Sequence, residues 1–255
     1  MKDLKLNYFE LIAPDPIYIQ NVGGILSPKL KDISRIGINT YQFYLNIILM
    51  DLKTYFTMVN QSEQFDSLSD EYKENLSVYD LLISEEENAK LLRNALDFFI
   101  AETVIWSKEH NAFLIYKDDN IIGFITKEIY PQICDLICQR NYIKSNFEDD
   151  LSKIKSKKAL EIMKKLQKGR SEKAKVAKTD NNMELGNIIS AVANRSQSLN
   201  MINIWDLTVY QVWDCFSRLS NNNIYDIQSM SVAHWGNKDN YFDASTWFKR
   251  IETTS

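Results

Sequence analysis

The feature that most constrains the fold is an abrupt change of composition after Tyr142. Between Lys153 and Lys178 the chain carries eleven basic residues and only two acidic ones, which gives this stretch a net charge of +9. The whole chain has a net charge of −4, so the remainder carries −13. Charge is therefore segregated along the chain, and segregated charge steers association and makes it sensitive to ionic strength.

This basic stretch predicts a three-part organisation. Its first half keeps apolar residues at helical spacing, whereas residues 169–182 have almost none and are typical of a linker or a frayed helix. We therefore expect a mixed α/β domain over residues 1–145, a basic helix or linker over 146–182 and a helical module over 183–255.

The first 60 residues are predicted to begin as extended structure and to continue as helices. Residues 8–12 and 16–19 flank a Pro-Asp-Pro turn, so the N-terminus is expected to be extended. Ser27-Pro28 resembles an N-cap followed by proline, which predicts a short helix that stops at Gly37. Thirteen of the twenty positions 40–59 are apolar, which predicts one long helix that is buried on most sides.

A three-stranded antiparallel meander is predicted over residues 103–125. Three β-rich runs in this region are separated by polar turns. The helix before the meander starts near Glu85–Glu87, where the helix dipole favours negative charge. Thr126 is expected to cap a helix that follows the meander.

The C-terminal module is predicted to be helical. Residues 185–192 and 209–219 each carry an apolar stripe at helical spacing. The run Asn221–Asn223 is expected to turn the chain into a third helix, and a short fourth helix is expected over 247–251. The fold class we expect is α+β, predominantly helical, with a small antiparallel β-meander followed by a C-terminal helical bundle.

The chain offers little material for catalysis or metal binding. It has two histidines and no Gly-x-Ser-x-Gly pattern or phosphate loop. Cys134 and Cys138 lie four residues apart, but no second pair completes a zinc site, so we expect them to be buried structural cysteines. His110 and His234 neighbour no nucleophile motif. We therefore expect no catalytic, cofactor-binding or metal-binding residue, and no enzyme activity.

Two features indicate a protein-binding surface. The basic stretch is either a solvated linker, a contact for an acidic protein surface or a nucleic-acid contact, and the absence of aromatics between Phe147 and Trp205 disfavours nucleic acid. Aromatic residues are dense in the C-terminal module, and exposed tryptophan and tyrosine are favoured interface anchors. The residues expected to bind a partner are Lys164, Lys165, Lys168, Arg170, Trp205, Tyr210, Trp235, Trp247 and Phe248.

The sequence shows no sign of membrane insertion or secretion. No apolar run follows the N-terminal residues, and the longest uncharged stretch with helical character, residues 36–50, is shorter than the ~20 apolar residues of a membrane span. Three sparse cysteines fit a reducing compartment. We expect a soluble intracellular protein.

Four segments resemble proteins of long-tailed bacteriophages. The segment IWDLTVYQVWD at residues 204–214 and the closing DASTWFKRI at 243–251 resemble the C-terminal helical part of tail-assembly chaperones from phages of Gram-positive bacteria. Near the N-terminus, VGGILSPKL at 22–30 and TYQFY at 40–44 resemble phage tail-region proteins.

This resemblance implies a non-enzymatic protein that acts in the host cytoplasm during assembly. It would keep the tape-measure protein soluble and recruit tail-tube subunits. The alternative is a permanent virion component of the neck, tail or baseplate. Homo-oligomerisation is left open, and no cofactor is implied.

Overall fold

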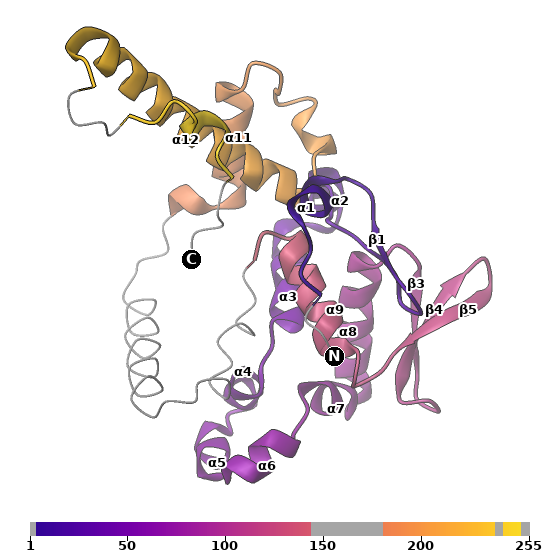
Figure 1. Cartoon of the computed structure of the whole chain (residues 1–255). Helices are drawn as coiled ribbons and strands as arrows, with labels where there is room; N and C mark the ends of the chain where they lie inside the picture. Colours follow the sequence, from indigo (N-terminus) through magenta and orange to yellow (C-terminus); the bar gives the residue numbers. More distant parts are fainter. Residues whose placement is uncertain (1–3, 144–180, 238–241, 251–255) are drawn as a thin grey trace. The chain divides into compact units, whose positions relative to one another are not determined.

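A computed structural model describes residues 4–143, 181–237 and 242–250 (Figure 1). Within these ranges the chain forms eleven α-helices and two small antiparallel sheets, so the predicted α+β, predominantly helical class is confirmed. Contacts divide the chain into two compact units. The first comprises residues 1–143 with 205–211, and the second comprises 144–204 with 212–255.

The predicted meander is present in the first unit. Strands β3 (Thr103–Ser107), β4 (Ala112–Lys117) and β5 (Asn120–Ile125) pair in this order, and both pairings are antiparallel. Asp118 and Asp119 connect β4 to β5 with φ angles of 49° and 62°. A two-residue hairpin loop with two positive φ angles matches the right-handed twist of the flanking strands, which is why this tight turn was readable from the sequence.

Helix α8 (Glu86–Phe99) builds the core beneath the meander and contacts β3. Its fully buried residues recur every three or four positions, at Ala89, Leu92, Leu96 and Phe99. Helix α9 (Tyr130–Arg140) adds a second apolar face and contacts the small hairpin of β1 (Ile17–Ile19) and β2 (Gly23–Ile25). The remaining helices of this unit are short: α1 (Tyr8–Ile12), α2 (Leu30–Ile36), α3 (Ile38–Ile48), α4 (Leu52–Met58), α5 (Ser62–Ser67), α6 (Asp70–Asn75) and α7 (Val78–Ile83).

The expectation that residues 8–12 are extended is wrong. They form α1 because Asn7 and Glu10 make a reciprocal capping box: the Asn7 side chain accepts from the Glu10 N–H at 3.0 Å, and the Glu10 carboxylate accepts from the Asn7 N–H at 2.7 Å. These two bonds satisfy backbone donors that a five-residue helix would otherwise leave to water.

The expected single helix over 40–59 is also wrong. Helix α3 ends at Ile48, and α4 starts afresh at Leu52 because the Asp51 carboxylate caps it by accepting from the Thr54 N–H at 2.7 Å. Two other helices start later than expected. Lys29 is the N-cap of α2, and Ile129 rather than Thr126 is the N-cap of α9.

A fully buried arginine holds the N-terminal segment against α9. The Arg140 guanidinium donates to the carbonyls of Glu10 at 2.5 Å, Ala13 at 3.0 Å and Asp15 at 2.8 Å. Its Nε has no hydrogen-bond partner among the described residues. The bonds to carbonyl oxygens compensate part of the cost of removing the charge from water.

Residues 205–211 fall inside the predicted C-terminal module, yet they pack in the first unit. The Leu30 N–H donates to the Leu207 carbonyl at 2.9 Å, and the Val209 N–H donates to the Pro28 carbonyl at 3.0 Å. The Lys31 ammonium pairs with the Asp206 carboxylate at 2.7 Å. This segment therefore adds a bridge to the first unit rather than to the second.

The C-terminal helices are present, but the expected turn at Asn221–Asn223 is not. Helix α12 runs without interruption from Val209 to Trp235, preceded by the 3₁₀ turn η4 (Ile204–Asp206). Gly236 follows it, with a φ of +78° that suits the left-handed position after a helix. The second unit also contains η3 (Asn181–Met183), α11 (Leu185–Arg195) and η5 (Thr246–Phe248).

Candidate functional site

The two cysteines of α9 are buried, and the two histidines are exposed. Burial raises the pKa of the Cys138 thiol to about 12 and raises that of Cys134 further, so both stay protonated and weakly nucleophilic at neutral pH. His110 bonds the Ser107 hydroxyl at 2.9 Å within a turn, and His234 is exposed near the end of α12. Throughout the part of the chain that is described, no three His, Cys, Asp or Glu residues lie close enough to hold a metal ion.

The N-terminal half of α12 lies against α11. The two helices line a groove of about 400 Å³, with Val192 and Arg195 on α11 and Phe216, Leu219 and Asn223 on α12. The Arg195 guanidinium donates to the Asn223 side chain at 3.0 Å. This bond marks the point where α11 ends, so the same side of α12 continues beyond Asn223 without α11 beside it.

A different side of α12 carries the C-terminal segment. Phe242 packs on the Tyr225 ring at a centroid distance of 5.5 Å, and the Arg218 guanidinium donates to the Lys249 carbonyl at 2.7 Å. Arg218 and Tyr225 are seven residues apart, so they lie on one side of the helix. Lys249 also pairs with Asp243, which closes the returning segment on itself.

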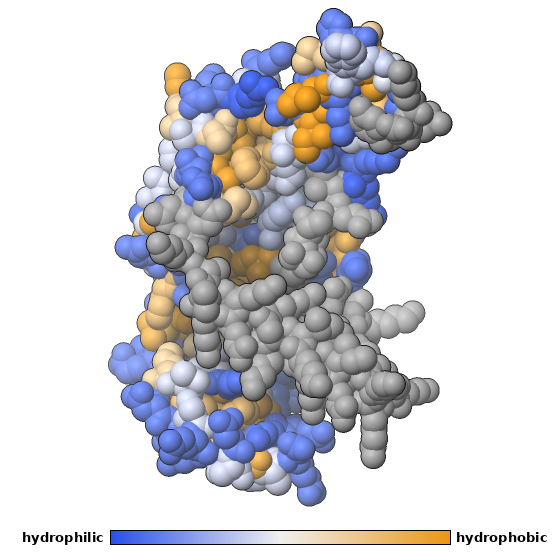
Figure 2. All heavy atoms as spheres, turned by 90° about the vertical axis from the view of Figure 1, so that its left-hand side faces the viewer, coloured by the Kyte–Doolittle hydropathy of each residue, from blue (hydrophilic) through white to orange (hydrophobic). Residues whose placement is uncertain are grey.

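The second half of α12 exposes four large apolar side chains, which we call the α12 face: Ile224, Ile227, Met230 and Trp235. Their exposed fractions are 46%, 58%, 58% and 79%. The α12 face continues the groove side of the helix, because Leu219, Asn223, Ile227 and Met230 follow one another at three- or four-residue spacing. In Figure 2, exposed apolar side chains appear among hydrophilic ones at the top of the view, the level that α12 occupies in Figure 1.

Charge is almost absent from this part of the helix. Between Leu219 and Trp235 the only ionisable side chains are Tyr225, Asp226 and His234. A partner that covers the α12 face would therefore bury apolar surface at ~25 cal/mol per Å² without having to desolvate paired charges. The α12 face can bind a complementary apolar surface, such as one side of an amphipathic helix.

The structure separates the residues that the sequence predicted as partner contacts. Trp235, Trp247 and Phe248 are exposed, and Trp247 packs edge-to-face on Phe248. Trp205 is half-buried. Tyr210 is only 4% exposed, and its ring packs on Tyr142 at 5.1 Å in the first unit, so the protein's own residues cover it. Lys164, Lys165, Lys168 and Arg170 lie outside the described residues.

Sequence reasoning missed the other members of the α12 face. Ile227 and Met230 were expected in a third helix of a bundle, and Ile224 was not singled out. Apolar residues three apart identify one side of a helix, but they do not say whether that side is covered. Only the position at which α11 ends distinguishes the α12 face from the core.

The chain is thus a predominantly helical α+β protein whose second unit presents an apolar helical face. Residues 175–252 match a family model described as the YomV second domain. YomV is a protein of a Bacillus phage region, and the match associates the C-terminal part of this chain with bacteriophage proteins. The matched residues include the whole α12 face. Comparisons with curated proteins and with solved structures give no match.

None of the helices in the described ranges combines the length and the apolar character needed to cross a membrane.

Proposed function

We propose that the protein is a non-enzymatic bacteriophage tail-assembly chaperone or adaptor. It binds the tape-measure protein in the host cytoplasm and recruits tail-tube subunits. The observation that carries this proposal is the α12 face, an exposed apolar stripe inside the region that matches a phage-associated domain. A chaperone for a long helical protein needs such a surface, because it must shield apolar helical stripes until assembly buries them.

The basic stretch supplies the second half of the proposal. Its charge of +9 attracts an acidic partner over a distance of about one Debye length, ~8–10 Å at physiological salt. The α12 face then makes the short-range apolar contact. This division gives fast capture through charge and retention through burial.

The test uses a double substitution on the α12 face, Ile227→Glu and Met230→Glu, in the full chain co-expressed with the phage tape-measure protein. Two new carboxylates on an apolar contact should lower the soluble fraction of the tape-measure protein at least about tenfold, because burying unpaired charge is costly. The matched control is Asn222→Glu with Ala233→Glu, two exposed positions on another side of the same helix. The control should keep the tape-measure protein soluble.

Mass spectrometry of purified particles separates this role from the alternative of a permanent neck, tail or baseplate component. A chaperone is absent from mature virions, whereas a structural component is present at stoichiometric copy number. Equal tape-measure solubility with the α12-face variant and with the control would contradict the proposal.

A further inference from the structure

The first unit contains a buried carboxylate with no cation beside it. Glu102, immediately before β3, is only 8% exposed. Its Oε2 accepts from the Gly24 N–H at 2.8 Å, the one hydrogen bond that this carboxylate makes with the described residues. No described cation lies within ion-pair distance of it either. A carboxylate with one hydrogen bond and no counter-charge keeps acceptor capacity for a cation in the pocket that it lines.

The neighbouring backbone is shaped to admit this side chain. Gly23 has a φ of +100°, and a Cβ at this position would come within 2.4 Å of the Glu102 carboxylate oxygen. A Cβ on Gly24 would come within 2.7 Å of Pro16. Strand β2 therefore needs glycine at position 23 so that the carboxylate can lie against its backbone, and glycine at position 24 so that the strand can pack on Pro16.

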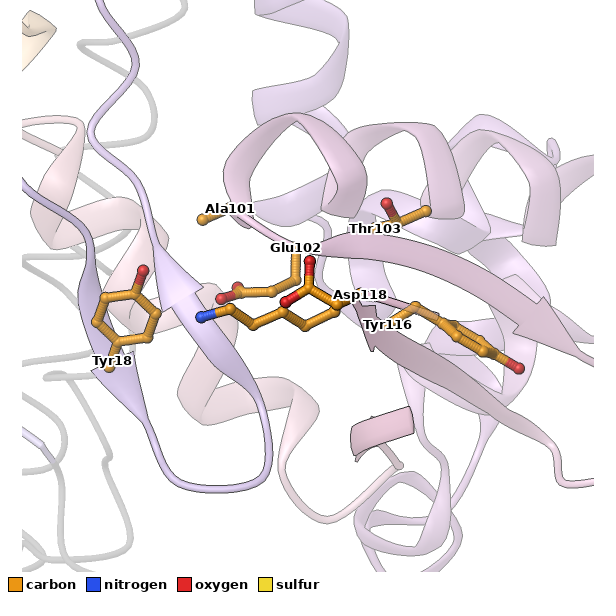
Figure 3. Close-up of a pocket in the computed structure, with 7 residues that line it drawn as sticks. Tyr18, Ala101, Glu102, Thr103, Tyr116 and Asp118 are labelled. Carbon is orange, nitrogen blue, oxygen red and sulfur yellow. The ribbon is translucent and has the colours of Figure 1, made fainter. Parts of the chain in front are cut away.

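Glu102 opens into a pocket of about 290 Å³. Figure 3 shows the Glu102 and Asp118 carboxylates and the Tyr18 ring around it, contributed by the residue before β3, the β4–β5 turn and β1. Its volume lies just below the range for ligand pockets, ~300–1,000 Å³, which suits a single side chain better than a larger molecule. Two carboxylates and an aromatic face are the groups that attract an organic cation.

The protein's own Lys117 shows which kind of cation the Tyr18 ring attracts. Its ammonium lies 5.7 Å from the centroid of the Tyr18 ring, inside the distance at which a ring attracts a cation. Lys117 also lines the pocket, yet its ammonium makes no ion pair with Glu102. The Tyr18 ring is thus already used by an alkylammonium group, while the Glu102 carboxylate makes no ion pair with a described residue.

We propose that this pocket binds an alkylammonium group, in which Glu102 supplies the buried acceptor, Tyr18 the aromatic face and Lys117 an internal competitor. The ligand chemistry is that of a lysine side chain of another protein or of a polyamine. This site lies in the first unit and does not depend on the α12 face, so it stands or falls separately from the proposed function.

The test titrates the full-length, isotope-labelled protein with n-butylammonium at low salt and follows its amide resonances. The Gly24 amide reports directly, because its N–H is bonded to Glu102. We expect saturable shifts at Gly24 and around Tyr18 and Asp118, with a dissociation constant of ~1–10 mM. The uncharged analogue n-butanol should cause no such shifts.

Three variants sharpen the result. Glu102→Gln keeps an acceptor for the Gly24 N–H but removes the charge, so it should fold normally and bind at least about tenfold more weakly. Lys117→Gln removes the competitor and should tighten binding roughly twofold to fivefold. Glu109→Gln, an exposed glutamate in the β3–β4 turn, is the matched control and should bind like the wild type.

The binding of two further ligands distinguishes a lysine side chain from a polyamine as the source of the ammonium group. Tighter binding of Nα-acetyl-lysine-N-methylamide than of spermidine identifies a protein side chain as the ligand, and the reverse order identifies a polyamine. The proposal is overturned if Glu102→Gln binds n-butylammonium as well as the wild type does. It is also overturned if n-butanol reproduces the shifts, or if none of the amines moves the Gly24 resonance.

Discussion

At the scale of single residues, Arg140 combines full burial with bonds to backbone carbonyls alone. Its guanidinium donates to four carbonyls of the segment from Glu10 to Asp15, in which α1 ends and the chain turns toward β1. A carboxylate partner would have satisfied the charge but would not have ordered this backbone. The side chain therefore acts as a clamp between α9 and the N-terminal segment.

Replacing Arg140 with methionine should lower the free energy of unfolding by about 3 kcal/mol, because several carbonyls lose their donor in a buried place. Urea unfolding measures the loss, and hydrogen exchange should speed up in α1. The control is Arg35→Met at an exposed ion pair with Asp32, which should change stability by less than about 1 kcal/mol. Equal effects at the two sites would show that the clamp contributes nothing.

The buried thiols of α9 give a pH dependence with a definite sign. Burial raises the pKa of Cys138 from 9.0 to about 12, so the native state keeps this proton when the unfolded chain has lost it. The stabilisation is complete below pH 9.0 and is lost as the pH rises toward about 12. Stability should therefore fall through this alkaline range, and the fall should be shallower in Cys138→Ala.

The same burial predicts selective alkylation. At about pH 8, iodoacetamide should label only Cys215 in the folded protein, and slowly, because this half-buried thiol also has a raised pKa. In urea all three cysteines should react, as mass spectrometry can count. Native labelling of Cys134 or Cys138 at the unfolded rate would contradict their burial.

At the scale of elements, α12 decides how the second unit presents its surface. A turn at Asn221–Asn223 would have folded Ile227 and Met230 back into a bundle. The continuous helix instead carries them beyond the end of α11. The α12 face therefore exists because the helix does not break.

Asn222→Pro distinguishes the two arrangements. Proline would be tolerated in a loop, but in the interior of a helix it costs about 3 kcal/mol. We expect loss of helical circular dichroism and faster hydrogen exchange in α12. Asn222→Ala should instead stabilise the helix by about 0.5 kcal/mol, and a proline variant as stable as the alanine variant would argue for a turn.

The sequence predicted those elements that are determined by residues close to one another in the chain. The meander was predictable because its tight turns and β-rich runs are neighbours in sequence. The break at Asp51 was missed because apolar residues continue across it. The asparagine run led to the wrong prediction of a turn, because asparagine side chains compete with the hydrogen bonds of a helix. In the structure the Asn223 side chain instead accepts from the Arg195 guanidinium.

The candidate sites depended on contacts between distant residues. The α12 face requires knowing where α11 stops, and the pocket brings together Tyr18, Glu102 and Asp118. No spacing in the sequence connects these three residues. Exposed aromatics were predictable as a group, but Tyr210 could not be told from Trp235 without the position of Tyr142.

At the scale of the whole molecule, the proposed division between charge and apolar contact predicts a salt dependence. Neutralising the basic stretch should leave folding intact but weaken capture of the tape-measure protein at low ionic strength, and the difference should vanish at high salt. The variant changes four residues to glutamine: Lys164, Lys165, Lys168 and Arg170. Binding rates measured at several salt concentrations test this.

A matched variant neutralises four exposed basic residues of the first unit: Arg35, Lys53, Lys90 and Lys108. It removes the same charge from the chain and should leave capture nearly unchanged. If the basic-stretch variant captures the partner as fast as the wild type at low salt, the stretch is only a linker.

The position of residues 205–211 has a consequence for how the protein responds to cleavage. The chain leaves the first unit after residue 143, returns to it for seven residues and leaves again. A single cut between residues 144 and 180 would therefore divide the covalent chain but not the first unit, since the C-terminal fragment still contributes Leu207 and Val209 to it. Nicked protein should therefore behave as one particle, because the N-terminal fragment lacks residues 205–211 of its own unit. The basic stretch can therefore be lengthened or replaced without separating the two parts of the chain. Residues 205–211 still hold the C-terminal part to the first unit by backbone hydrogen bonds.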